Sequence, residues 1–167
     1  TYPLYTPKSG WAEQKTDEWW TSICKAVRNV VAKSGISKSS IIGMSVDTTC
    51  CTVICMDKNM EVIRPAILWM DVRASKQAKK ITQTKHDVFK YVGYGNVSAE
   101  TMPAKLLWLK ENEREVYDKA EHIMECTDWL LYRLTGEINA SISECGPRWF
   151  YDRPNGGYRR DFYEQCD

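Results

Sequence analysis

The stretch IIGMSVDTTCCTVICMD, residues 41–57, indicates the fold class of this 167-residue chain. Residues 41–46 and 52–56 are short runs rich in β-branched and other apolar side chains, and a polar break separates them. Two such runs predict a pair of buried strands. Residues 57–60 supply turn formers, and residues 61–63 and 66–69 could continue a strand meander. A hairpin-rich sheet is therefore expected here.

Helical patterns flank this predicted sheet on both sides. In residues 16–34 the apolar positions recur every three or four residues, which predicts one helix with an apolar face. Thr16 or Asp17 can cap its start, and Gly35 can end it. The apolar positions are Trp20, Ile23, Cys24, Val27, Val30 and Val31.

The second half of the chain is expected to be mostly helical. A helix is expected at residues 74–82, and another after Thr101, with Pro103 in its first turn. Residues 122–125 read as a short strand that leads into a helix from Thr127 to Leu134, ended by Gly136. The last thirty residues have a loop composition, with a helix starting near residue 160. The pattern as a whole predicts an α/β or α+β domain.

Composition excludes several classes of protein. Twenty-three basic and 22 acidic residues give a net charge of +1, so no overall field favours nucleic acid. No apolar run approaches the roughly 20 residues that a membrane helix needs. Seven cysteines without a CxxC pair, together with two histidines, favour free thiols in a reducing cytosol over disulfides or a zinc site. We therefore expect a cytoplasmic protein without a metal site or membrane partner.

Common nucleotide and hydrolase motifs are missing, whereas small polar groups cluster at the predicted sheet. Residues 47–52 (DTTCCT) lie between two predicted strands, and Trp69 and Asp71 follow another. An aromatic face beside hydrogen-bonding groups is a common way to bind a polyhydroxylated ligand. Bland alternatives stay open. Trp69 could be a packing residue, Asp71 could pair with Arg73, and the Cys50-Cys51 pair could be small buried apolar residues.

Three linked stretches carry a more specific signal: SGWAEQKTDEWW (9–20), IIGMSVDTTCCTVICMD (41–57) and IRPAILWMDVRA (63–74). In order and spacing they resemble the first domain of the FGGY family of carbohydrate kinases. Residues 98–137 and the aromatic stretch PRWFYD (147–152) are also similar to this family. The resemblance covers nearly the whole chain.

The resemblance implies a ribonuclease-H-like (actin-like ATPase) α/β domain with a mixed sheet flanked by helices, incomplete in this chain. It implies a small-molecule sugar as substrate, with ATP and Mg²⁺ as cofactors of the full-length enzyme. Substrate-facing residues implied by the family pattern are Cys50, Cys51, Trp69, Asp71 and Glu100. The motif that contains Trp11, Glu13 and Gln14 is expected to be mainly structural.

Departures from the family pattern narrow the substrate. Glycerol kinases carry an Arg-Glu pair near the position of Cys50-Cys51, and xylulokinases carry a Met-His pair, whereas this chain has neither. The VDTTCCT stretch is more similar to ribulokinases and the broader pentulose-kinase group, whose corresponding loop reads roughly VD-x-T followed by small residues. Small side chains at these positions leave room for a longer substrate. A five-carbon ketose is the expected substrate, followed by a four- or five-carbon polyol.

The resemblance also implies what these 167 residues lack. Residues 1–167 are expected to be a partial N-terminal domain, without the first strands, the catalytic aspartate and the nucleotide-binding domain, so no catalytic residue is expected here. Unpaired sheet edges would favour a homodimer. Alternatives to a kinase part that is inactive by itself are a non-catalytic sugar sensor and an interaction domain with a vestigial pocket.

Overall fold

The structure, a computed structural model, describes residues 1–92 and 95–166. Its helices are α1 (Thr16–Ser34), α2 (Ser75–Gln83), α3 (Met102–Asn112), α4 (Arg114–Lys119), α5 (Cys126–Thr135), α6 (Ile142–Trp149) and α7 (Arg160–Cys166). Its strands are β1 (Glu13–Gln14), β2 (Ile54–Met56), β3 (Ala66–Ile67), β4 (His122–Met124), β5 (Tyr151–Asp152) and β6 (Gly157–Tyr158). Short 3₁₀ turns lie at Lys38–Ser40, Asp87–Val92 and Arg153–Asn155.

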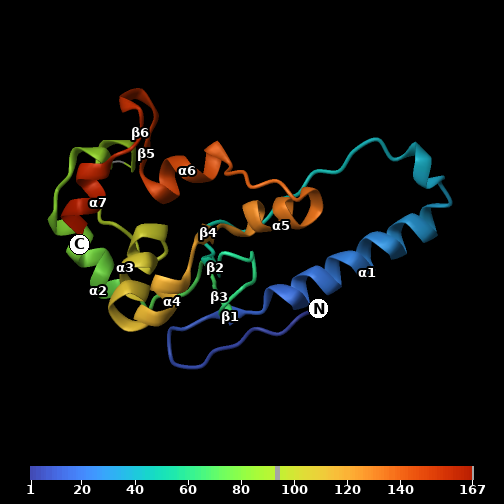
Figure 1. Cartoon of the computed structure of the whole chain (residues 1–167), viewed down its shortest axis with the longest axis horizontal. Coiled ribbons are helices and arrows are strands. Elements are labelled where there is room, and N and C mark those ends of the chain that lie inside the picture. Colours follow the sequence, from blue (N-terminus) through green and yellow to red (C-terminus); the bar gives the residue numbers. More distant parts are fainter. Residues whose placement is uncertain (93–94, 167) are drawn as a thin grey trace.

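Strand β2 is the centre of the small sheet (Figure 1). It pairs with β4 in antiparallel register, with Ile54 opposite Met124. On its other side, single bridges join Val53 to Ile67 and Met56 to Val62, so the chain returns through a hairpin as predicted. Strand β3 then pairs with β1. The spatial order is therefore β1, β3, β2, β4, and the pairings among the described residues are antiparallel.

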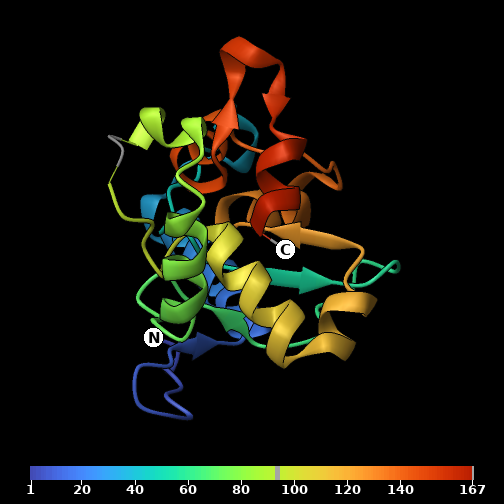
Figure 2. The same ribbon diagram turned by 90° about the vertical axis from the view of Figure 1, so that its left-hand side faces the viewer.

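Consecutive side chains of β2 face two different apolar cores, because side chains of a strand alternate between its faces. Val53 and Cys55 face the core built with α2, α3 and α7, whereas Ile54 and Met56 face the core built with α1 and α5. Figure 2 shows α2 and α3 on one side of the strands. The sheet is thus a thin central layer with helices on both faces, as in α/β domains.

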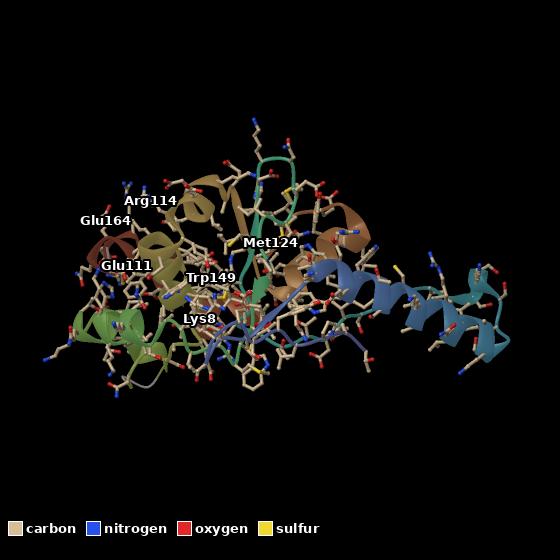
Figure 3. The ribbon with its side chains drawn as sticks, turned by 90° about the horizontal axis from the view of Figure 1, so that it is seen from below. Lys8, Glu111, Arg114, Met124, Trp149 and Glu164 are labelled. Atoms are coloured by element: carbon tan, nitrogen blue, oxygen red, sulfur yellow. The ribbon has the colours of Figure 1, made fainter. Side chains whose placement is uncertain are left out.

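Helix α1 has the predicted bounds, and Gly35 ends it in the left-handed conformation with φ 68°. The predicted cap at Thr16 or Asp17 is wrong, because Thr16 is already the first helical residue and Lys15 precedes it without a side-chain capping bond. The predicted apolar face of α1 is only partly used, since Trp20 and Ile23 are partly buried, and the buried tryptophan is Trp19, which the prediction did not include. Trp19 packs edge-on against Trp129, with ring centroids 6.0 Å apart. The outer turns extend away from the strands, and Val30 keeps 66% of its surface exposed (Figures 1 and 3). Only the first turns of α1 therefore belong to the core.

The strand predicted at residues 41–46 is not formed. These residues are irregular, and Ile41, Ile42 and Met44 are exposed. A strand is stable only when a neighbour satisfies its backbone groups, and no described segment offers that neighbour here. The apolar pattern alone was therefore not sufficient.

Several later predictions are confirmed. Helix α3 begins directly after Thr101, α5 ends at Gly136 with φ 77°, and residues 122–124 form β4. Helix α7 begins at Arg160. Helix α6 was not expected, because Gly146-Pro147 reads as a loop, yet Pro147 lies inside that helix.

Buried charges join the N-terminal segment to the rest of the domain. Arg73 donates through Nη2 to Glu13 (2.8 Å) and to Asp71 (2.7 Å), and its side chain is fully buried. Arg64 donates to the same Glu13 oxygen at 2.7 Å and to Glu113 at 2.9 Å. The Arg73 guanidinium also lies 3.7 Å from the ring centre of Trp11, a favourable cation–π distance. Three separate chain segments thus meet at one ionic network.

None of the helices in residues 1–92 and 95–166 combines the length and apolar character that a bilayer span requires.

The ionic network predicts a large effect of Arg73→Met on stability. The substitution removes the cation that pairs with the buried carboxylates of Asp71 and Glu13. Removing one partner of a buried ion pair typically lowers the free energy of unfolding by about 3–5 kcal/mol. Urea denaturation should show this loss. Arg160→Met is the matched control, because the Arg160–Glu164 pair is exposed and is worth less than about 0.5 kcal/mol. Equal, small losses for both variants would show that the network is not needed for folding.

Candidate functional site

The turn at residues 50–52 lies directly before β2 and carries two of the predicted sugar contacts. Cys51 is 3% exposed and has φ 59°, a conformation that residues other than glycine seldom adopt. Burial, the largest effect, raises the pKa of the Cys51 thiol to about 12, so it stays a neutral thiol at pH 7. Cys50 is half-buried. Both side chains are small, but Cys51 is buried, as its alternative role of a small buried apolar residue requires, so Cys50 is the more accessible of the two.

Residues 68–71 follow β3 and carry two more predicted contacts. Trp69 is 40% exposed, so the indole is not part of the core, which weakens the packing alternative. Asp71, two residues later, is fully buried. Its Oδ2 accepts from the Ala12 N–H at 2.6 Å and from Arg73 at 2.7 Å, and its Oδ1 accepts from the backbone and side chain of Arg73, both at 2.9 Å.

The protein therefore occupies all the hydrogen-bonding positions of Asp71. A direct contact between Asp71 and a sugar stays a prediction, and it would require one of these bonds to be exchanged. What the structure does show is a carboxylate that joins the segment carrying Trp69 to the N-terminal segment through the Ala12 N–H, and that also fixes the backbone at Arg73.

The two segments are joined from below by Lys105 of α3. Its Nζ donates to the Cys51 carbonyl at 2.5 Å and to the Leu68 carbonyl at 2.7 Å. Burial lowers the pKa of Lys105 to about 8, while Cys51, Asp71, Glu125 and Glu100 act in the opposite direction. Glu100, half-buried in the turn before α3, thus belongs to the same electrostatic neighbourhood as the other predicted residues.

The structure adds two residues that the sequence reasoning missed, Glu125 and Arg148. Glu125 is buried just before α5, and burial raises its pKa to about 7, although the backbone amides of Cys51 and Thr52 lower it. Arg148 of α6 lies beside the Cys50 and Cys51 thiols. The similarity of the PRWFYD stretch to the family was a signal for Arg148, but Gly146-Pro147 at its start was interpreted as a loop.

Some polar atoms around the turn at residues 50–52 have no hydrogen-bond partner among the described residues. They are the Thr52 hydroxyl and Nε of Arg148. Buried polar atoms are rarely left unpaired in native proteins, so such a group needs an explanation. Unpaired donors and acceptors beside an exposed indole are suited to a ligand with many hydroxyl groups.

Residues 47–49, which belong to the polar cluster predicted at residues 47–52, directly precede this turn. They line a cavity of about 540 Å³ together with Trp19 and Trp129 from the second core. Thr48 and Thr127 are hydrogen-bonded through their hydroxyl groups at 2.6 Å. This cavity is adjacent to the candidate site but does not include Trp69.

Comparisons with known proteins identify the family. All of residues 1–167 match the model of the FGGY family of carbohydrate kinases, N-terminal domain. The human FGGY carbohydrate kinase domain-containing protein is 35% identical over 162 residues, which are 91% of this chain and 29% of that protein. A D-ribulokinase from Saccharomyces cerevisiae is 33% identical over 145 residues, 80% of this chain and 20% of that protein.

A solved structure agrees with these sequence matches. The xyloylose kinase from Brucella ovis superposes with a TM-score of 0.89 at 22% identity, over 99% of this chain and 34% of that one. The predicted actin-like α/β fold is thereby confirmed. The chain spans about a third or less of the length of these relatives. It belongs to the FGGY family of carbohydrate kinases, and it corresponds to the N-terminal domain of that family.

Proposed function

We propose that the full-length protein transfers phosphate from ATP to a hydroxyl of a five-carbon ketose, and that this chain supplies the sugar-binding surface. The observation that carries the proposal is the exposed indole of Trp69 beside a turn bordered by unpaired polar atoms. Relatives named xylulose kinase and ribulokinase support a pentulose as the substrate.

Each residue of the surface has a distinct proposed role. The Trp69 indole packs against the C–H face of the sugar. In this proposal Glu100, which interacts electrostatically with Lys105, accepts from the sugar hydroxyl groups, and Arg148, which lies beside Cys50 and Cys51, donates to them. Cys50 and Cys51 contribute little bulk, which leaves room for five carbons. Asp71 holds the Trp69 segment in place and reaches the sugar only by exchanging a bond.

ATP and Mg²⁺ are the cofactors implied by the family. Across residues 1–92 and 95–166, however, no group of three or more His, Cys, Asp or Glu side chains is arranged to hold a metal ion. In this proposal ATP and Mg²⁺ are bound by segments outside these residues, and no catalytic base is assigned to them. The residues of this chain bind and orient the sugar, so we expect no turnover from these 167 residues alone.

The activity can be tested with the full-length protein in a coupled ADP-release assay. The panel contains D-ribulose, L-ribulose, D-xylulose, L-xylulose, ribitol and glycerol. We expect at least one ketopentose to exceed glycerol in kcat/KM by more than about tenfold, the difference expected from one lost hydrogen bond of about 1.4 kcal/mol. Sugar binding by calorimetry without ADP release would favour the sensor alternative, and neither binding nor turnover would favour an interaction domain.

Trp69→Ala should raise the KM for the sugar roughly three- to tenfold, because it removes the stacking face. The melting temperature should change little, since the indole is 40% exposed. Met70→Ala is the matched control, because Met70 is the next residue and is 42% exposed. A large drop in the melting temperature with an unchanged sugar KM would instead show that Trp69 is a packing residue.

A further inference from the structure

Lys105 is a fully buried lysine in the middle of α3. Lysine is almost never buried completely unless its charge is paired. Among the described residues its ammonium group forms no ion pair, and it donates instead to two backbone carbonyls, those of Cys51 and Leu68. Burying an ammonium group in this way is unfavourable, as its lowered pKa shows. A requirement for these two bonds would explain its position.

The two carbonyls lie where the sheet opens. Val53 and Ile67 exchange backbone hydrogen bonds at 2.9 and 3.0 Å. One residue farther from this pair, Leu68 turns away and donates to Ala12 at 3.0 Å, and the chain at Cys51 takes a positive φ. The two segments therefore separate at the point where they begin to carry the predicted sugar contacts. No backbone ladder can fix their spacing beyond it.

Lys105 supplies the connection that the ladder lacks. A single ammonium group has three donors, and here two of them reach across the opening to one carbonyl on each side. Charge-assisted hydrogen bonds are about twice as strong as neutral ones, so this bridge is stiff. Helix α3 packs in the first core and thus anchors the bridge to the body of the domain.

We propose that Lys105 is a positioning residue that fixes the turn at Cys50-Cys51 against the Trp69 segment, and so sets the width of the sugar site. The role in sugar binding rests on the proposed function, whereas the mechanical role does not. Lys105 touches no substrate in this account. It acts through the backbone of the two segments that do.

The decisive experiment compares wild-type, Lys105→Met and Lys79→Met forms of the full-length protein. Lys79 is exposed on α2 and controls for the loss of a lysine charge. Each protein is alkylated with N-ethylmaleimide under native conditions, and modification of Cys51 and Cys55 is followed by fragment-ion mass spectrometry. These thiols are a matched pair, because both are buried and burial raises the pKa of each to about 12.

Lys105→Met should raise the labelling rate of Cys51 about tenfold or more while that of Cys55 changes less than about twofold, since only the turn is released. The KM for the sugar should rise at least about fivefold, with the KM for ATP within about twofold of wild type. Lys79→Met should match wild type in all four values. Lys105→Arg, which keeps a cation with several donors, should lie between wild type and Lys105→Met.

Three results would overturn the positioning role: unchanged labelling of Cys51, equal acceleration at Cys51 and Cys55, or a released turn with an unchanged sugar KM in an active kinase. If Lys105→Met does not fold, Lys105→Arg is tested instead. A Cys51 labelling rate and a sugar KM equal to those of the wild type in Lys105→Arg, whose side chain is bulkier, would count against the proposal. If the wild type phosphorylates no sugar, the proposed function fails separately, while the contrast between Cys51 and Cys55 still decides the mechanical role.

Discussion

The buried guanidinium of Arg73 is the interaction on which the arrangement of this domain depends. It pairs with Asp71 and Glu13 and lies against the ring of Trp11, so it joins the N-terminal segment to the chain that follows β3. Each of these charges would be costly to bury alone, and they are tolerated because they satisfy one another. The network therefore specifies one geometry for the segment that presents Trp69.

The candidate site lies where the pairing between the strand segments at Val53 and Ile67 ends. Alternating side chains of β2 hold a helical layer on each face of the sheet, which fixes the strands. Beyond Val53 and Ile67 the two segments separate, and near the opening the Thr52 hydroxyl and Nε of Arg148 have no hydrogen-bond partner among the described residues. The ion pairs of Arg73 thus fix the segment that carries Trp69, and Lys105 joins this segment to the turn near Cys51. Unpaired polar atoms close to that turn are the physical argument for a ligand site.

Local signals in the sequence were sufficient for elements that depend on local chemistry. Gly35 and Gly136 end α1 and α5 as expected, because a left-handed residue is a local requirement. Residues 41–46 failed as a strand because a strand depends on a partner elsewhere in the chain. For the site, Trp69 could be proposed from an aromatic residue after a strand, but Lys105 could not, since a lysine in a helix is usually at the surface.

The central claim is that the Trp69 segment and the turn at residues 50–52 together form the sugar site. It is tested most directly by a crystal structure of the full-length protein with a ketopentose bound. We expect the sugar to lie against the Trp69 indole, with its hydroxyl groups toward Arg148, Glu100 and the turn. A sugar bound at a site that includes neither Trp69 nor Cys50-Cys51 would contradict it.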